Sequence, residues 1–368
     1  MVTRMDVSVV LPALNEEKSI GKTLKELKKI LSYIKLECEI IVVDSDSEDK
    51  TADIVRKHGA KVINERQRGY GNALRRGFRE SQGTYVIMYD PDGSYDINTI
   101  PRMIYLLDDG YDYVNANRFA RLTNNSMTFK NFVGNKIINF VGSLFFGVSG
   151  KDMLSGFKAF KKEALEKMDL KAQKWDINVE MHSKIRKNGL KFAEVATKYY
   201  PRIGASKLSG TTAAWNNFRY MLMYSPNFIF VYPSIFLMIL SILSALIILR
   251  SSSLGNVSLL LFAMIFMIGF QMLLFGIMSK TYLYRKGFEN LSLLSRLGSR
   301  LTIEKGITAS LAIFLTSFII FLMLLIKWFR SERVLELIDI KLGIVGFTLM
   351  MSSISILTYS FINQTLSE

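Results

Sequence analysis

Four long apolar blocks in the C-terminal part constrain this chain more than any other feature of its sequence. They run from Phe228 to Leu249, Val257 to Ser279, Gly306 to Trp328 and Leu342 to Phe361. Each has about 20 residues, enough at about 1.5 Å per residue to cross a hydrocarbon core of about 30 Å. We therefore expect four transmembrane helices, the alternative being a buried helical core. The residues before about 225 mix charged and apolar side chains, which is typical of a separate water-soluble part.

The charges between the apolar blocks favour one orientation in the membrane. The connection between the second and third blocks carries most of the cations: Lys280, Arg285, Lys286, Arg296, Arg300 and Lys305. Since the first connection holds only Arg250, the positive-inside rule puts the middle connection in the cytoplasm. Four spans then return the C-terminus to the cytosolic side, although cations in the third connection weaken this signal. The N-terminus lacks the long apolar core of a signal peptide, which also favours a cytosolic N-terminal part.

The composition narrows the kinds of site that the chain can hold. With 47 Lys and Arg against 32 Asp and Glu, the net charge of +15 suits an anionic membrane surface, a phosphorylated ligand or nucleic acid about equally. The single cysteine, Cys38, excludes an internal disulfide framework, and two histidines are too few for a histidine-rich metal site. Any metal would therefore be bound through oxygen atoms.

Short apolar runs alternate with helical patterns in the N-terminal part. Five runs predict strands: Val7 to Pro12, Glu39 to Asp44, Lys61 to Asn64, Thr84 to Asp90 and Asp112 to Asn117. Between the first two, apolar residues recur at helical spacing from Ile20 to Leu31, and Asn15 is the predicted N-cap. This alternation predicts a doubly wound α/β fold with a mostly parallel sheet.

Polar side chains follow three of the predicted strands. In a doubly wound sheet the ligand lies outside the carboxyl ends of the strands. Those ends carry Asn15 and Glu16, then Asp44 and Asp46, then Asp90 and Asp92. The Asp-x-Asp pair in "YDPDGSYD" suits Mg²⁺ or Mn²⁺, hard cations that prefer oxygen and share their coordination with substrate phosphates. The alternative is an ordinary acidic turn, since Pro-Asp-Gly is itself typical of turns.

Two common nucleotide-binding motifs are absent from the sequence. No G-x-G-x-x-G follows the first predicted strand, and the later segment "RGYGNALRRGF" has Leu74 where a third glycine would stand. A P-loop of the form GxxxxGK[ST] is also missing. The sequence therefore predicts a nucleotide site built from carboxylates, in which Asp90 and Asp92 hold a metal against a diphosphate.

Seven segments occur in the order found in one known family. They are "VVLPALNEE", "IIVVDSDSEDKT", "RGYGNALRRGF", "YDPDGSYD", "NRF", "SGFKAFKKEAL" and "EVATKYYPRIGASKL". Together they resemble glycosyltransferase family 2, with its Rossmann-like GT-A nucleotide-sugar fold of a mostly parallel sheet and helices on both faces. The last two segments, followed by membrane helices, are similar to the dolichyl-phosphate mannose and dolichyl-phosphate glucose synthases. The segments "DGSYD" and "YSPNFIF" look nearer to the glucose synthases.

The resemblance implies a function and a donor site. It implies inverting transfer of one hexose from a nucleotide sugar to dolichyl or polyprenyl phosphate, with UDP-glucose favoured as donor and GDP-mannose next. The implied metal ligands are Asp90 and Asp92, with Mg²⁺ or Mn²⁺ as the cofactor. The implied donor-binding residues are Pro12, Leu14, Asn15, Glu16, Asp44, Asp46, Gly71 and Asp90. Two positions depart from the family: Asp46, usually Gly, for which an N-cap is the alternative role, and Pro91, often Ala.

The acceptor phosphate requires cations near the membrane. The resemblance implies that it is bound by Arg118, Lys136, Ser155, Arg202 and Lys207, and that the catalytic residues are Asp92, Arg118 and Arg202. For each cation the alternative is a solvated surface charge, and Lys158 stands where the family often has Arg. Because a phosphate monoester is already mostly ionised at neutral pH, no catalytic base is required.

These expectations divide the chain into three parts. Residues 1–210 form a cytosolic glycosyltransferase domain, 211–226 an interfacial amphipathic helix, and 227–368 a transmembrane domain with four helices. The segment from Asn131 to Gly147 also looks interfacial, the alternative being a helix packed on the sheet. The expected partners are the nucleotide sugar, the polyprenyl phosphate and the membrane, without nucleic acid.

Three other functions share part of this pattern. A processive polysaccharide synthase would carry a Gln-x-x-Arg-Trp motif, which none of the three tryptophans completes. A transferase acting on a hydroxyl of a lipid-linked glycan would need a carboxylate base, for which Glu180 is the only guess. A non-catalytic lipid flippase or scaffold that senses nucleotide sugar is disfavoured by the intact pair of Asp90 and Asp92.

Overall fold

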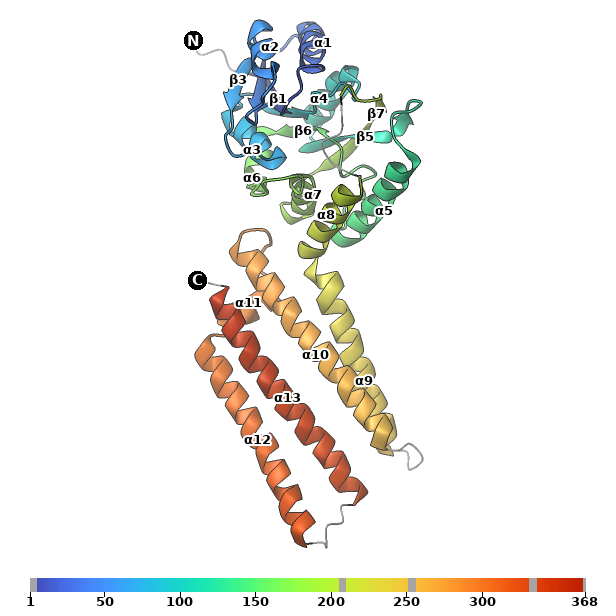
Figure 1. Ribbon diagram of the computed structural model, residues 1–368, viewed down its shortest axis with the longest axis vertical. Helices are drawn as coiled ribbons and strands as arrows, with labels where there is room; N and C mark the ends of the chain where they lie inside the picture. The colour runs from blue at the N-terminus through green and yellow to red at the C-terminus, as the bar shows by residue number, and fades with distance from the viewer. Residues whose placement is uncertain (1–4, 205–209, 251–255, 331–335, 367–368) are drawn as a thin grey trace. The chain divides into compact units, whose positions relative to one another are not determined.

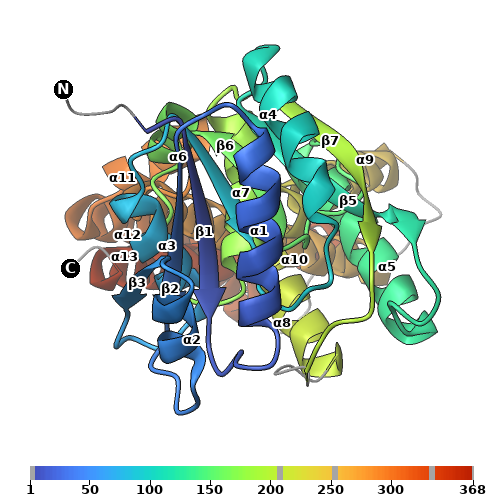
Figure 2. The same ribbon diagram turned by 90° about the horizontal axis from the view of Figure 1, so that it is seen from above.

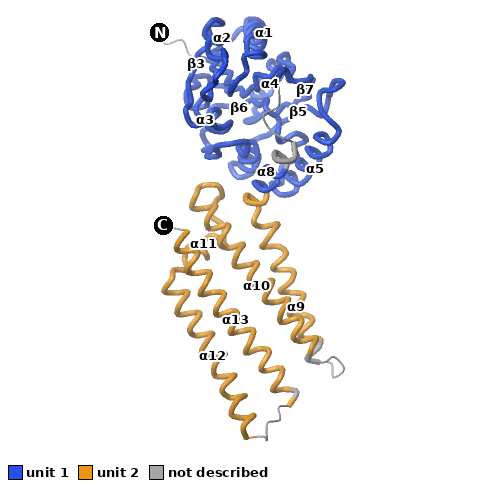
Figure 3. Tube along the Cα trace, viewed as in Figure 1, with its two compact units in different colours: residues 1–221 blue, residues 222–368 orange. Residues whose placement is uncertain are grey.

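The chain forms two compact units, residues 1–221 and 222–368 (Figure 3). The computed structural model describes residues 5–204, 210–250, 256–330 and 336–366. The boundary between the units falls inside the segment 211–226, near the end of helix α8 (Gly210–Met223).

A seven-stranded mixed sheet forms the centre of the first unit (Figure 1). Its strands are β1 (Val7–Ala13), β2 (Cys38–Asp44), β3 (Lys61–Asn64), β4 (Tyr85–Tyr89), β5 (Tyr113–Leu122), β6 (Phe157–Lys161) and β7 (Phe192–Tyr199). The order is β3-β2-β1-β4-β6-β5-β7, and only β6 runs antiparallel to its neighbours. The five strands predicted from the sequence are confirmed. The continuous burial of β1 is that expected of a strand covered on both faces.

Helices cover both faces of this sheet, as predicted. The helices of this unit before α8 are α1 (Ile20–Tyr33), α2 (Thr51–Lys57), α3 (Tyr70–Glu80), α4 (Ile100–Asp108), α5 (Phe129–Phe146), α6 (Lys162–Met168) and α7 (Ile177–Lys187), with a 3₁₀ turn η1 (Ile97–Thr99). Of these, α5 packs against α7. Figure 2 shows α1 and α4 in front of the strands, where Leu24 and Met103 share a core with Val9. On the opposite face, α3 packs so closely that a Cβ added at Gly77 would overlap Val10.

The start of α1 corrects one prediction. The helix begins at Ile20 with Ser19 in the N-cap position, so the assignment of Asn15 as its N-cap is wrong. Asn15 instead has a left-handed backbone with a φ of +50°. Its Oδ1 accepts a hydrogen bond from the Glu48 N–H at 2.8 Å, and its own N–H donates to Ser47 Oγ at 2.9 Å. Asn15 therefore joins the loop after β1 to the loop after β2.

The second unit is built from long apolar helices. A π-helical turn η2 (Asn227–Val231) leads into α9 (Tyr232–Arg250), and α10 (Asn256–Arg285), α11 (Leu293–Arg300), α12 (Ile303–Arg330) and α13 (Leu337–Thr365) follow. In the part of the chain that the structure describes, four helical spans are long and apolar enough to cross a membrane, and only 11% to 17% of their most apolar windows is buried inside the protein. The prediction of four transmembrane helices is confirmed, and the alternative of a buried helical core is wrong because these apolar surfaces face outward.

Candidate functional site

One edge of the sheet gathers the polar strand ends. Because β1, β2, β4, β5 and β7 run in the same direction, their carboxyl ends lie together. A cavity of about 400 Å³ opens at this edge. Six of the predicted site residues line it: Pro12, Leu14, Glu16, Asp90, Asp92 and Arg202. The remaining lining residues include Ser45, Arg68, Tyr70, Lys174 and Trp175.

Asp92 lies in the loop that follows β4, and Ser94 fixes its carboxylate. Its Oδ1 accepts hydrogen bonds from the Ser94 N–H at 3.0 Å and from Ser94 Oγ at 2.6 Å. Its Oδ2 lies 3.7 Å from Nε of Arg202. The Asp92 carbonyl also accepts a hydrogen bond from the Ile203 N–H at 2.8 Å, which fixes the segment that carries Arg202 beside this loop.

Arg202 lies between two carboxylates of the cavity. Its Nη2 is 3.5 Å from Oε1 of Glu16, and its Nε faces Asp92. In the part of the chain that the structure describes, this buried Nε has no hydrogen-bond partner. A buried donor without an acceptor is costly, so the arrangement favours an anionic ligand that supplies the missing oxygen.

Asp90 is packed tightly on two sides. Its Oδ1 accepts a hydrogen bond from the Tyr70 hydroxyl at 2.7 Å. On another side lies Gly156, where an added Cβ would overlap the Asp90 carboxylate. The glycine of the "SGF" segment is therefore required for this carboxylate to occupy its place. Burial, together with the nearby Asp92 carboxylate, raises the pKa of Asp90 to about 7.

The donor set of the cavity fits Mg²⁺ or Mn²⁺. Asp90 and Asp92 place two carboxylates in one cavity, and hard divalent cations prefer such oxygen ligands. Among the described residues, no group of three or more His, Cys, Asp or Glu side chains is placed to hold a metal alone. A metal at this pair would therefore complete its coordination with oxygens of a bound diphosphate and water.

Four of the predicted donor-binding residues flank the cavity without lining it: Asn15, Asp44, Asp46 and Gly71. The side chain of Asp44 is buried and accepts a hydrogen bond from Ser47 Oγ. At Gly71 an added Cβ would overlap the carbonyl oxygen of Ala172, so glycine lets the loop 172–174 pack against the start of α3.

Asp46 does not cap the helix that follows it, which was the alternative to a donor-binding role. Helix α2 begins at Thr51 with Lys50 in the N-cap position, so an N-cap role for Asp46 is wrong. Asp46 has a φ of +63°, and its carboxylate lies 3.7 Å from Nη2 of Arg68, a residue that lines the cavity. The residue thus contacts the cavity wall through Arg68.

Arg118 forms a buried ion pair behind the cavity. Its Nε donates to Oδ2 of Asp152 at 2.8 Å and its Nη2 donates to Oδ1 at 2.7 Å. Arg118 is 8% exposed and Asp152 is 0% exposed, so the alternative of a solvated surface cation is wrong for Arg118. The guanidinium also lies 5.3 Å from the ring centroid of Tyr199.

Two other predicted acceptor residues, Ser155 and Lys136, do not line the cavity. Ser155 is fully buried, and its carbonyl accepts a hydrogen bond from the buried Lys158 amine. Burial lowers the pKa of Lys158 to about 7. Lys136 is exposed on α5, 5.1 Å from the ring centroid of Phe119. Lys207 lies outside the described residues.

Glu180 has a structural environment. Its fully buried carboxylate accepts a hydrogen bond from Lys184 Nζ at 2.7 Å and from the backbone N–H groups of Lys171 and Ala172 at 3.0 Å and 2.8 Å. It does not line the cavity. The carboxylate therefore orders the loop before α7, which argues against Glu180 as a general base.

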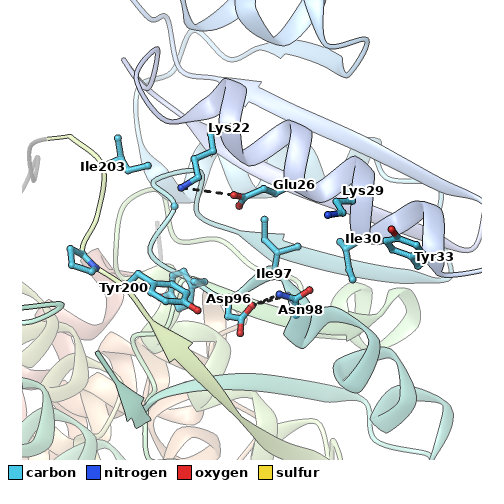
Figure 4. A pocket seen from close by; sticks show the side chains of 13 residues that line it. Lys22, Glu26, Lys29, Ile30, Tyr33, Asp96, Ile97, Asn98, Tyr200 and Ile203 are labelled. Carbon is cyan, nitrogen blue, oxygen red and sulfur yellow. Dashed lines mark hydrogen bonds and ion pairs between the residues drawn. The ribbon is translucent and has the colours of Figure 1, made fainter. Parts of the chain in front are cut away.

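A second pocket, of about 480 Å³, lies beside α1 (Figure 4). Its polar side chains contact one another: Lys22 lies 3.9 Å from Glu26, and Asn98 Nδ2 donates to Asp96 at 2.8 Å. Neither acid of the Asp-x-Asp pair lines it. The cavity that contains this pair is therefore the candidate functional site.

Several residues that build the site were missed in the sequence, and four of them make the contacts described here: Tyr70, Ser94, Asp152 and Trp175. Ser94 had a local signal, because a serine two residues after an aspartate is typical of a turn closed by the carboxylate. The other three make contacts across long stretches of chain. The rings of Tyr70 and Trp175 stack with centroids 3.9 Å apart and an interplanar angle of 11°.

Two family models match the chain in separate regions. The model of glycosyl transferase family 2 matches residues 8–169, and the model of the glycosyltransferase family 2 C-terminal transmembrane region matches residues 277–367. The first match contains the Asp-x-Asp pair, and the second contains three of the four spans in whole or in part.

Three relatives have informative names. The chain is 28% identical over 281 residues to the low-salt glycan biosynthesis hexosyltransferase Agl6 of Haloferax volcanii, covering 74% of this chain and 68% of the relative. It is 30% identical to a dolichyl-phosphate hexose transferase of the same organism, covering 55% of this chain and 86% of the relative. It is 29% identical to the dolichol-phosphate mannosyltransferase of Pyrococcus furiosus, covering 56% of this chain and 60% of the relative.

Among solved structures, the chain is similar to glucosyl-3-phosphoglycerate synthase from Mycobacterium tuberculosis in complex with Mn²⁺, UDP and glucosyl-3-phosphoglycerate. The TM-score is 0.48 at 20% sequence identity, and the match covers 59% of this chain and 79% of that chain.

Proposed function

This chain belongs to glycosyltransferase family 2, and on that premise we propose that it transfers one hexose from a nucleotide sugar to dolichyl or another polyprenyl phosphate. It is an integral membrane glycosyltransferase. The proposal rests mainly on one observation: Asp90, Asp92 and Arg202 line the same cavity. Among the described residues, Nε of this arginine has no hydrogen-bond partner. Two relatives whose names specify dolichyl or dolichol phosphate support this acceptor. UDP-glucose is the favoured donor, and GDP-mannose is next.

The donor would occupy the cavity at the carboxyl ends of the strands. Pro12, Leu14 and Glu16 would contact the nucleotide, with Asn15, Asp44, Asp46 and Gly71 shaping the surrounding loops. Asp90 and Asp92 would hold Mg²⁺ or Mn²⁺ against the diphosphate. When bound, this cation stabilises the negative charge that develops on the departing nucleoside diphosphate.

The acceptor phosphate is its own nucleophile. Its second pKa is near 6, so at neutral pH it is mostly a dianion and needs no base to remove a proton. A phosphate oxygen forms the new bond to the anomeric carbon as the bond to the diphosphate breaks, with inversion at that carbon. The task of the protein is then to align two phosphate groups and to reduce their repulsion.

Arg202 is the cation best placed for that task. Its Nε lacks a partner in the described structure, and the guanidinium lies beside Asp92. Arg118, held by Asp152, adds positive charge behind the cavity, while Ser155 shapes the adjoining loop. Lys136 and Lys207 stay proposed contacts for the acceptor phosphate.

We predict that Arg202→Ala raises the KM for dolichyl phosphate by about 10-fold or more, since a charge-assisted hydrogen bond contributes about 1.5–3 kcal/mol. The KM for the donor is expected to change much less. Steady-state kinetics with each substrate varied in turn measures both values. Arg56→Ala, which removes an exposed arginine paired with Asp53, is the control. An unchanged acceptor KM in Arg202→Ala would refute the role.

A face of helix α5 provides a contact with the membrane. Five apolar side chains at helical spacing are exposed on it: Phe129, Val133, Ile137, Phe140 and Leu144. Phe129 and Phe140 are 82% and 72% exposed, whereas Ile138 and Gly142 on the opposite side are buried. We propose that this face and helix α8 lie in the lipid headgroup layer.

We also propose that the first unit is cytosolic, because cations concentrate in the connection between α10 and α12. Protease added to sealed, inverted membrane vesicles should digest the first unit. Digestion only in right-side-out vesicles would reverse this orientation.

The function is tested by the purified full-length chain with dolichyl phosphate, Mg²⁺ or Mn²⁺, and four labelled donors in parallel: UDP-glucose, GDP-mannose, UDP-GlcNAc and UDP-galactose. A hexosyl lipid from one donor supports the proposal and identifies the sugar. No lipid product, with donor still bound, would favour a glycan hydroxyl as acceptor or a non-catalytic nucleotide-sugar sensor.

A further inference from the structure

Tyr70 and Trp175 both line the donor cavity, and Tyr70 contacts the first acid of the Asp-x-Asp pair. The Tyr70 hydroxyl donates a hydrogen bond of 2.7 Å to Oδ1 of Asp90. The Tyr70 ring stacks on Trp175 in a nearly parallel arrangement, with centroids 3.9 Å apart. A ring held in this way directs its hydroxyl toward a single position, so the stack constrains the hydrogen bond.

The loop that carries Trp175 is itself fixed to the start of α3. The N–H of Asn72 donates to the Gln173 carbonyl at 3.0 Å. The buried Glu180 carboxylate accepts the N–H groups of Lys171 and Ala172. Trp175 therefore packs on Tyr70 from a loop that is held at several points, rather than from a free segment.

The Asp90 carboxylate has little freedom once Tyr70 is in place. Its Oδ1 is bound by the Tyr70 hydroxyl, and Gly156 leaves room for the carboxylate only because it lacks a Cβ. The Tyr70 hydroxyl is the donor in this hydrogen bond, because an ionised carboxylate can only accept.

We propose that Tyr70 is a positioning residue that fixes Asp90 for the metal–diphosphate site, and that Trp175 holds the Tyr70 ring for this purpose. The inference rests on the proposed function, because it requires Asp90 to face a bound divalent cation. Groups that hydrogen-bond to metal ligands contribute strongly to metal affinity, and their removal typically lowers it about 10- to 100-fold.

The test measures Mn²⁺ binding to the full-length chain by electron paramagnetic resonance of the free ion. UDP is present, because oxygens of a bound diphosphate complete the coordination, and a protein-free sample of Mn²⁺ and UDP is the reference. Tyr70→Phe keeps the ring and its stack but removes the hydroxyl. We expect its Kd for Mn²⁺ to rise about 10-fold. The thermal unfolding midpoint should stay close to that of the wild type, since the ring remains packed. A purely structural role for Tyr70 would not change the metal affinity of a folded protein.

Trp175→Ala should raise the same Kd less, by about 3-fold, because the Tyr70 ring loses its support but keeps its hydroxyl. The double variant Tyr70→Phe/Trp175→Ala should bind Mn²⁺ no more weakly than Tyr70→Phe, since both changes act through one hydrogen bond. The matched control is Tyr85→Phe, which removes a hydroxyl that donates to Asp108 at 2.5 Å, outside the cavity.

The outcomes separate this inference from the proposed function. If the wild type binds Mn²⁺, Asp92→Asn weakens binding, and Tyr70→Phe binds as the wild type does, the positioning role is wrong and the metal site stands. If Trp175→Ala has no effect, or the two changes add, the role assigned to Trp175 is wrong. If the wild type binds no Mn²⁺ beyond the protein-free reference even with UDP present, both the metal assignment and this inference are overturned.

Discussion

Asp92→Asn is expected to lower the rate of hexose transfer by about 10³-fold while leaving the fold intact. The substitution keeps the shape of the side chain, and the amide oxygen can still accept the hydrogen bonds from Ser94. What is lost is the negative charge on the oxygen that faces Arg202 and would bind the cation. Turnover measured at saturating donor and acceptor, beside the thermal unfolding midpoint, checks both parts of this expectation.

The matched control for Asp92→Asn is Asp96→Asn, four residues along the same loop. Asp96 accepts hydrogen bonds from Asn98 and lines the second pocket, not the donor cavity. The Asp96→Asn variant should therefore retain nearly normal turnover. Near-normal activity in Asp92→Asn, or an equal loss in both variants, would contradict the metal assignment.

Asp152→Ala is expected to lower the free energy of unfolding of the first unit by about 3–5 kcal/mol. The substitution removes the carboxylate that receives two side-chain hydrogen bonds from Arg118 and leaves a buried guanidinium unpaired. At the size of this unit, such a loss corresponds to a fall of about 10 °C in the unfolding midpoint. Thermal unfolding of the detergent-solubilised chain measures it.

Asp53→Ala provides the comparison for Asp152→Ala. It also removes an acid paired with an arginine, but the side chains of Asp53 and Arg56 are 70% and 64% exposed. Exposed pairs contribute little to stability, so the midpoint should hardly move. Equal effects from the two variants would show that burial of the Arg118 pair is unimportant.

The sheet and the spans were predictable because their signals are local and repeated. The apolar runs of β1, β2 and β4 are buried strands, and four blocks of about 20 apolar residues are the membrane helices. The convergence of Glu16, Asp90 and Asp92 also followed from the parallel direction of the predicted strands, whereas Arg202 was assigned only from the family resemblance. Chain direction alone brings such residues to one edge.

The detailed contacts of the site were not predictable, because they join segments that are distant in sequence. The Arg118–Asp152 pair spans 34 positions, and the Tyr70–Asp90 hydrogen bond spans 20. Both depend on where the antiparallel strand β6 and the loop before α7 pack, and no spacing rule gives that packing. The error at Asn15 has the same origin, since its side chain bonds to the loop after β2 and not to α1.

The central claim is that the acceptor is a phosphate, and comparing two acceptors tests it most directly. The purified chain would be given its preferred labelled nucleotide sugar with Mn²⁺, and either dolichyl phosphate or dolichol, which has a hydroxyl in place of the phosphate. The account predicts a hexosyl lipid from dolichyl phosphate, one nucleoside diphosphate released for each hexose transferred, and no product from dolichol. Comparable product from dolichol, or transfer only to the hydroxyl of a lipid-linked glycan, would contradict the account.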